Sequence, residues 1–124
     1  WYWNADDENR QWADKFMAKT GTRPTFAHAA NYSAAIQYLE AVQAKGTDNP
    51  DEIIKDLEGK KINDVYLRNG EIRAADHAVV HDAYLAQVKT KDESSEPWDV
   101  EKILETVPAN EAYAAPNPAC RING

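Results

Sequence analysis

Two of the three histidines, His77 and His81, have a spacing that could bind a metal ion. Residues four apart share one face of a helix, and imidazole is a common metal ligand. The residues around this pair alternate as in a strand, however, which places the two side chains about 13 Å apart. One ion does not bridge that distance, so we expect structural or surface roles for both histidines and no metal site.

Acid–base and nucleophilic catalysis also lack a convincing arrangement of residues. Neighbours on a strand point to opposite faces, so Asp76 and His77 are not expected to pair. Ser33 lacks the Gly-x-Ser-x-Gly turn that exposes a nucleophile, and the five glycines form no phosphate-binding loop. Cys120 has only Arg121 as a basic neighbour, which is weak support for a reactive thiolate. We therefore expect a protein that is not an enzyme and that needs no cofactor.

The aromatic side chains are a more informative group. Packing in a core is their ordinary role, and it remains the alternative for each of them. One set lies at or just before the predicted helix starts, namely Trp1, Tyr2, Trp3, Phe26 and His28. Ligand sites of open α/β sheets lie at such strand-to-helix transitions. These residues are therefore candidates for the wall of a ligand cleft.

Three helices are predicted to position these residues. The first begins at a cap formed by Asn4 or Asp6 and ends at Gly21. The second covers roughly residues 27–45, where apolar residues recur with helical spacing. The third begins at an Asn49 cap, which a proline follows at the first helical position. Its buried stripe is expected to be Ile53, Ile54 and Leu57.

The second half of the chain is predicted to be largely extended. Residues 62–68 alternate with the period of a strand, and Asn69-Gly70 is a strong hairpin-turn signal. Residues 78–88 form another extended segment. Residues 100–107 carry apolar positions spaced for a helix, although their β-branched residues leave a strand possible. Residues 109–124 are expected to be an irregular tail.

Composition restricts the class of partner. The 124 residues include 14 Lys+Arg and 21 Asp+Glu, and the net charge of −7 would repel a phosphate backbone, so nucleic acid is not expected. No apolar run approaches the roughly 20 residues of a membrane span. The chain opens on Trp1-Tyr2-Trp3, and one hairpin with one further strand gives its helices little sheet to cover. Both features predict a piece of a larger α/β protein.

Several short runs, taken in their order and spacing, resemble one family along nearly the whole chain. They are residues 1–8, 24–25, 32–35, 41–47, 72–73, 81–85, 87–89 and 97–99. Together they resemble the C-terminal third of periplasmic substrate-binding proteins of the branched-chain amino-acid type. These proteins are the receptors that feed ATP-binding-cassette (ABC) importers.

The resemblance implies part of the two-lobed type I periplasmic-binding-protein fold, an α/β architecture that traps a ligand between its lobes. Residues 25–46 would be a helix of the first lobe. Residues 1–24 and 47–124 would belong mainly to the second lobe and the hinge. The helices, the hairpin and one or two further strands would thus contribute to both lobes, beside a missing N-terminal part of the same protein.

The resemblance also implies that the loop entering the second helix supplies a side chain to the ligand. The ligand-binding residues implied in this way, together with the aromatic start, are Phe26, Ala27, His28, Tyr32, Tyr2 and Trp3. Relatives often carry an aromatic residue at the position of Ala27. The methyl group here leaves room for a bulkier ligand, or moves the contact to Phe26 or His28.

The implied function is that of a periplasmic solute-binding receptor for an ABC importer. It would capture a small carboxylate ligand, an amino acid or an aromatic acid, and deliver it to a membrane permease. The alternative is an independent small α/β interaction or structural domain without catalytic activity. The ligand's identity is left open, because most of the implied pocket lies outside this sequence.

Two expectations about association follow from the implied family. Unpaired strand edges and apolar helix faces predict binding to the missing part of the protein, or an intertwined oligomer. Disulfides persist in the periplasm, so Cys120 would pair with a cysteine of the missing part or remain a free thiol. Both states of Cys120 are open at this point.

Overall fold

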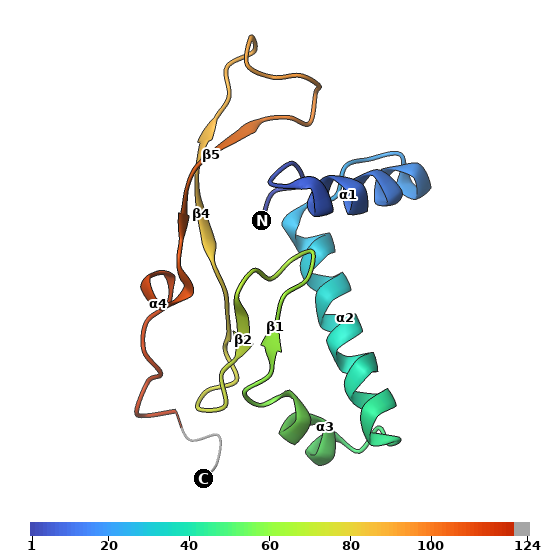
Figure 1. Ribbon diagram of the computed structural model, residues 1–124, viewed down its shortest axis with the longest axis vertical. Helices are drawn as coiled ribbons and strands as arrows, with labels where there is room; N and C mark the ends of the chain where they lie inside the picture. Colours follow the sequence, from blue (N-terminus) through green and yellow to red (C-terminus); the bar gives the residue numbers. More distant parts are fainter. Residues whose placement is uncertain (121–124) are drawn as a thin grey trace.

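The computed structural model describes residues 1–120 and shows an elongated molecule with the first three helices along one side and the strands and the last short helix along the other (Figure 1). The helices of this part are α1 (Asp7–Thr20), α2 (Phe26–Lys45), α3 (Pro50–Leu57) and α4 (Ala109–Ala112). The strands are β1 (Lys61–Ile62), β2 (Gly70–Ile72), β3 (Val79–Val80), β4 (Ala83–Val88) and β5 (Glu101–Val107). The prediction of an irregular tail over residues 109–124 was wrong at its start, where backbone hydrogen bonds to Pro108 and Ala109 close the short helix α4, and residues 121–124 lie outside the described residues.

The predicted helix boundaries are confirmed by the groups that cap them. Asp6 caps α1 by accepting a hydrogen bond from the Asn9 backbone N–H at 2.8 Å. Gly21 ends that helix in the left-handed region, with φ of 78°, which glycine adopts without steric cost. Asn49 caps α3, as predicted. The prediction for the buried stripe was wrong at Ile54, which is 44% exposed because no other part of this chain covers it.

The predicted strand over residues 62–68 was wrong, and Asn69-Gly70 is not the hairpin turn. The Asp64 carboxylate accepts hydrogen bonds from the backbone N–H groups of Tyr66 and Leu67, which curls this segment into a loop. The connection between β1 and β2 is therefore long, and Gly70 is the first residue of β2, where it pairs with Ile62. A side chain at Gly70 would meet the Ile62 carbonyl oxygen at 3.0 Å, so the close approach of the two strands requires glycine.

Residues 78–88 form two strands where one extended segment was predicted. β3 pairs with β2 in the antiparallel sheet β1-β2-β3, and the chain then leaves that sheet at His81 and Asp82. His77 lies in the turn before β3 with φ of 54°, and its Nε2 contacts Glu58 Oε1 at 2.7 Å. His81 Nδ1 contacts the Asp82 carbonyl oxygen at 2.7 Å, so both histidines make structural contacts, although His77 is not on a strand.

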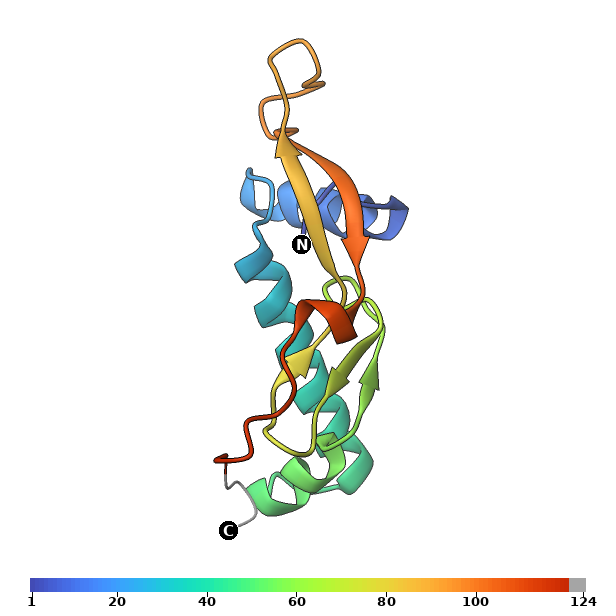
Figure 2. The same ribbon diagram turned by 90° about the vertical axis from the view of Figure 1, so that its left-hand side faces the viewer.

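Residues 100–107 form a strand and not the helix that their spacing favoured. β5 pairs with β4 in a separate antiparallel sheet, with an irregularity between Leu85 and Ala86. Helical spacing of four apolar positions was a weak signal in a segment rich in Val, Ile and Thr, and the partner strand decided the conformation. This β4–β5 hairpin extends past α1 and away from the rest of the molecule (Figure 2).

Two groups of elements follow one another along the long axis, and Arg68 of the loop after β1 joins them through an ion pair with Asp6 at 3.0 Å. α3 packs against α2, and the sheet β1-β2-β3 is joined to α2 by a 2.6 Å hydrogen bond from Ser33 Oγ to Asp64 Oδ2. At the other end, α1 lies across the start of α2, and its buried Ala13 packs with Tyr2, Trp3 and Ile103 of β5. The α1–α2 connection therefore lies where the two groups meet (Figure 1).

The molecule exposes more surface than a compact protein of its mass. Its accessible area is 8225 Å², whereas a folded monomer of 13.9 kDa is expected to expose about 6,700 Å². Large apolar side chains contribute to this excess on α2 and on both strands of the β4–β5 hairpin. Among the described residues, no helix has the length and apolar character needed to cross a membrane.

Candidate functional site

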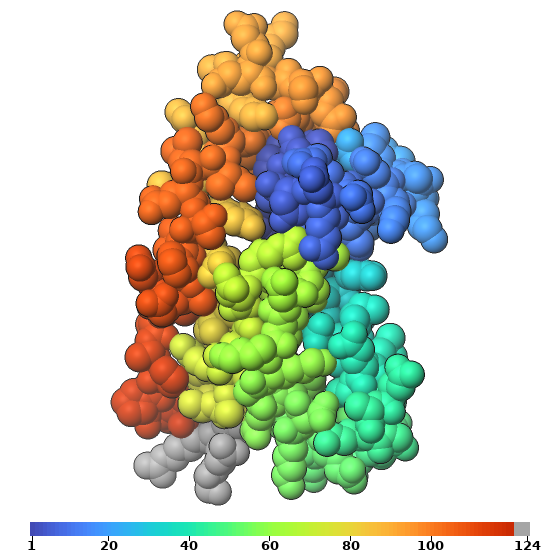
Figure 3. Space-filling view, viewed as in Figure 1, coloured from blue at the N-terminus to red at the C-terminus, as the bar shows by residue number. Residues whose placement is uncertain are grey.

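A cavity of about 290 Å³ opens beside the N-terminal segment. Its walls come from three places in the chain: the first residues, the α1–α2 connection, and the segment that leads into β5. The lining residues are Trp1, Tyr2, Trp3, Arg23, Pro24, Thr25, Phe26, Trp98, Val100 and Glu101. Figure 3 shows the N-terminal residues in blue between the orange C-terminal strand and the green loop after β1.

The structure brings three of the six predicted site residues together in this cavity. Tyr2, Trp3 and Phe26 line it, although Phe26 follows the other two by more than twenty residues. Phe26 is the first residue of α2, and its side chain is 62% exposed. An aromatic ring that is exposed at a helix start, over a hollow walled by other rings, is available to a ligand.

The other three predicted residues lie outside the cavity lining. His28 belongs to the capping box of α2, where its Nδ1 accepts a hydrogen bond from the Thr25 backbone N–H at 3.0 Å. Its ring also packs on Phe16 of α1, with ring centroids 4.9 Å apart. Tyr32 packs on Trp12, and Ala27 is exposed. These contacts give His28 and Tyr32 an observed role in joining α1 to α2.

Buried hydrogen bonds hold the aromatic wall of the cavity in place. The indole Nε1 of Trp3 donates to the Trp98 carbonyl oxygen at 2.9 Å. The Tyr2 hydroxyl donates to Asp99 Oδ1 at 3.0 Å, and it accepts from the Glu101 backbone N–H at 3.3 Å. The first residues are thus tied to a segment almost 100 residues later, which no local sequence pattern indicates.

Arg23 places a cation at the cavity. Its guanidinium group lies over the Trp3 ring, 4.1 Å from the ring centroid, which is the geometry of a cation–π contact. Glu96 Oε1 accepts from the Arg23 Nε at 2.9 Å, and Asp14 also pairs with this side chain. The two carboxylates compensate the charge, so Arg23 serves first to join α1, the α1–α2 connection and the loop before β5.

Sequence analysis did not place Arg23 or Trp98 at the site. The signal for Arg23 was its position between the cap Gly21 and Pro24, in the connection that enters α2. Trp98 belongs to one of the runs that resemble the family, but its pairing with Trp3 depends on the tertiary fold. Within residues 1–120, no group of three or more His, Cys, Asp or Glu side chains is arranged to hold a metal ion.

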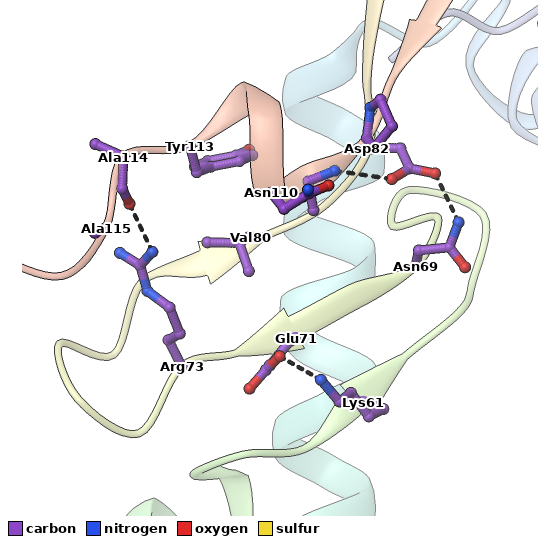
Figure 4. A pocket seen from close by; sticks show the side chains of 12 residues that line it. Lys61, Asn69, Glu71, Arg73, Val80, Asp82, Asn110, Tyr113, Ala114 and Ala115 are labelled. Atoms are coloured by element: carbon purple, nitrogen blue, oxygen red, sulfur yellow. Dashed lines mark hydrogen bonds and ion pairs between the residues drawn. The ribbon is translucent and has the colours of Figure 1, made fainter.

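A larger hollow of about 640 Å³ lies between the sheet β1-β2-β3 and the segment after β5. Its charged side chains bind one another or the backbone, as Figure 4 shows. Arg73 donates to the Ala114 carbonyl oxygen at 2.8 Å, while Asp82 accepts from the Ala109 backbone N–H at 3.1 Å. These contacts hold residues 109–115 against the sheet. The charged groups of this hollow are thus used within the fold, so it is a weaker candidate for a ligand site than the cavity beside the N-terminal segment.

Comparison with known protein families identifies the family of this chain. The sequence profile of the family described as periplasmic binding protein matches residues 1–94. The chain belongs to this family. A comparison with curated proteins finds no match.

Solved structures of periplasmic binding proteins resemble the chain over 92–93% of its length. One is a periplasmic binding protein from Burkholderia mallei, with 43% identity and a TM-score of 0.86. Another is a branched chain amino acid ABC transporter periplasmic ligand-binding protein from Burkholderia xenovorans LB400, with 36% identity and a TM-score of 0.88. A third, an amino acid ABC transporter substrate-binding protein from Pseudomonas fluorescens Pf-5, has 26% identity and a TM-score of 0.76.

The match spans only part of each related periplasmic binding protein. This chain covers 30% of the two Burkholderia structures and 32% of the Pseudomonas structure. The predicted relationship to periplasmic binding proteins and the predicted mixed α/β fold are thereby confirmed. The excess of exposed surface has a simple origin if the remainder of such a fold packs against this chain.

The buried Asp99 beside the cavity predicts a pH-dependent stability. A hydrogen bond from Lys89 holds the pKa of the Asp99 carboxyl far below its usual range. Because the folded-state pKa is depressed, the carboxylate stabilises the fold above about pH 4, and this stabilisation is lost as the pH falls. We expect Asp99→Asn to lower the free energy of unfolding at pH 7, by an amount that shrinks below about pH 4. Denaturant unfolding at a series of pH values measures this difference, and a pH-independent difference would contradict the prediction.

Proposed function

We propose that the chain is part of a solute-binding receptor of an ABC importer, which captures a small carboxylate ligand in the periplasm. The ligand would be an amino acid or an aromatic acid, and the receptor would deliver it to a membrane permease. Two related structures are described as binding proteins of amino acid ABC transporters, which supports this class of partner. The observation that carries the proposal is the aromatic cavity at the start of α2.

The cavity suits a ligand with an apolar body and one anionic end. The rings of Trp3, Phe26 and Trp98 offer flat apolar surface to the body of the ligand. The first backbone N–H groups of α2, those of Phe26 and Ala27, have no intrahelical partner and favour a carboxylate. Glu101 lies on the cavity wall and is an acceptor for an ammonium group, as an amino acid would carry.

The two packing groups provide a natural position for a ligand between lobes. Sequence analysis assigned residues 25–46 to one lobe and residues 47–124 mainly to the other. Because α3 and the sheet β1-β2-β3 pack with α2, we propose that residues 47–80 accompany the first-lobe helix. The second lobe would then take α1 and the β4–β5 hairpin, and the cavity would lie beside the α1–α2 connection that crosses between them.

An independent small interaction domain accounts less well for the same observations. A self-sufficient domain of this mass is expected to expose about 6,700 Å² and not the observed 8225 Å². Large apolar side chains of the β4–β5 sheet, such as Leu85 and Leu104, are also exposed. We propose a binding function without catalysis, which is supported by related structures described as ligand-binding or substrate-binding proteins.

Calorimetric titration tests the proposed function. It uses the proposed receptor that contains this chain and the rest of the two-lobed fold, called the longer receptor below. The panel contains aliphatic and aromatic amino acids, aromatic acids, and the methyl ester of each compound. We expect at least one acid to bind with a dissociation constant of about 1 μM or below. Its ester should bind at least about tenfold more weakly, because a charged hydrogen-bond acceptor has been removed. Equal binding of acid and ester, or no binding by any compound, would contradict the proposal.

A further inference from the structure

Asp99 is the most completely buried acidic side chain near the cavity, with 1% of its surface exposed. It does not line the cavity. Its carboxylate accepts hydrogen bonds from Lys89 Nζ at 2.7 and 2.8 Å, and from the backbone N–H and Oγ of Ser95 at 3.0 and 2.9 Å. It also accepts from Tyr2 Oη and Asn4 Nδ2, each at 3.0 Å. One side chain therefore joins the N-terminal segment to the loop between β4 and β5.

The two carboxylate oxygens of Asp99 have different partners. Oδ1 accepts from Tyr2 and Asn4, the residues on either side of Trp3. Oδ2 accepts from the backbone and side chain of Ser95, which closes the loop onto itself. Lys89 donates to both oxygens. The oxygen that faces the N-terminal segment thus holds the two neighbours of a ring that forms the cavity wall.

Lys89 makes this arrangement compatible with an anionic ligand. A bare carboxylate behind the wall would repel a negatively charged ligand across a few ångströms of low-dielectric protein. The ammonium group of Lys89 contacts both Asp99 oxygens, so the pair presents little net charge to the cavity. Only 17% of the Lys89 side chain is exposed, which limits screening of the pair by water.

We propose that Asp99 is a positioning residue for the ligand cavity, which it serves by fixing Tyr2 and Asn4 and thereby the Trp3 ring against Trp98. The ligand-binding part of this inference rests on the proposed function. The positioning part does not, because it depends only on hydrogen bonds between residues of this chain. The two parts are therefore tested by separate measurements on the same variants.

The first measurement reports the aromatic wall without ligand. The longer receptor is labelled with 5-fluorotryptophan, and the ¹⁹F signals of Trp3 and Trp98 are assigned by replacing each with phenylalanine. Asp99→Ala should shift or broaden both signals below the unfolding temperature. Asp99→Asn loses the ion pair with Lys89 as well, but it keeps an oxygen that accepts from Tyr2 and Asn4. We therefore expect smaller spectral changes in this conservative variant, even where its unfolding temperature falls as far.

The second measurement is the affinity of the same variants for the best ligand of the titration panel. We expect Asp99→Ala to weaken binding at least about tenfold, with a partial recovery in Asp99→Asn. Unchanged ¹⁹F signals in Asp99→Ala would overturn the inference. Changed signals with unchanged affinity would also overturn it, and would show that this wall is not part of the ligand site. Failure of the parent to bind any compound would reject the proposed function alone, since the ¹⁹F result would stand.

A milder pair of variants keeps the test decisive if Asp99→Ala does not fold. Tyr2→Phe removes a hydroxyl that donates to Oδ1, and Ser95→Ala removes a hydroxyl that donates to Oδ2. Each change deletes one hydrogen bond to Asp99 at a similar distance, and Tyr2→Phe also removes the acceptor of the Glu101 backbone N–H. We expect the Trp3 signal to shift in Tyr2→Phe and to stay in place in Ser95→Ala. Equal shifts in both variants would mean that Asp99 acts on stability without positioning the wall.

Discussion

Replacing Phe26 with alanine in the longer receptor is expected to weaken ligand binding by about 1–3 kcal/mol, the range for losing a buried apolar contact. Phe26 is 62% exposed and lines the cavity, so it has little packing within this chain to lose. The thermal midpoint of the ligand-free protein should therefore change little. Calorimetric titration and a melting curve on the same sample measure both effects.

His28→Ala is the matched control for this prediction. His28 lies two residues further along α2, where it completes the capping box with Thr25 and packs on Phe16. Loss of a cap costs about 1 kcal/mol of stability, so the melting midpoint should fall. Sequence analysis placed both residues in the site, and the structure separates them by what each side chain contacts. If Phe26→Ala binds as tightly as the parent while His28→Ala binds more weakly, the cavity has been assigned to the wrong side of the helix.

The 124-residue chain made alone is expected to self-associate. It exposes 8225 Å², about 1,500 Å² more than a compact monomer of its mass. Exposed apolar residues lie on both strands of the β4–β5 hairpin, among them Leu85, Val88 and Leu104. An apolar strand pair of this kind is a template for pairing with another chain.

Size-exclusion chromatography with light scattering measures this association. Addition of the remaining part of the receptor, produced as a separate chain, should convert the oligomers into a complex with one copy of each part. The isolated chain should also bind ligand poorly, because it supplies only one portion of the pocket. A stable monomer with a cooperative melting transition would contradict the prediction and favour the independent small domain.

The state of Cys120 stays a prediction. The side chain is exposed and free among the described residues, which is compatible with a thiol or with pairing to a cysteine elsewhere in a longer protein. Thiol titration of the denatured, unreduced receptor distinguishes these states.

Local sequence was sufficient to determine α1, α2 and α3 and the class of fold, whereas α4 was not predicted. Asp6 and Asn49 begin α1 and α3, and Gly21 and Gly46 end α1 and α2, because caps act through hydrogen bonds within a few residues. The family could also be recognised, since it depends on the order of short runs along one chain. Tyr2, Trp3 and Phe26, which were singled out as aromatic residues at helix starts, line one cavity, and their role in ligand binding stays a prediction.

Tertiary contacts decided the strands and the composition of the cavity. β5 is a strand because β4 lies beside it. Asn69-Gly70 is not the hairpin turn, because hydrogen bonds to Asp64 form the turn earlier in the chain. Trp98 and Asp99 reach the N-terminal segment across almost 100 residues of sequence. A strand and a cavity wall obtain their stability from partners that are distant in sequence, whereas a helix satisfies its hydrogen bonds within four residues. The sequence of this protein therefore determined where α1, α2 and α3 form, and only the folded chain determined what they enclose.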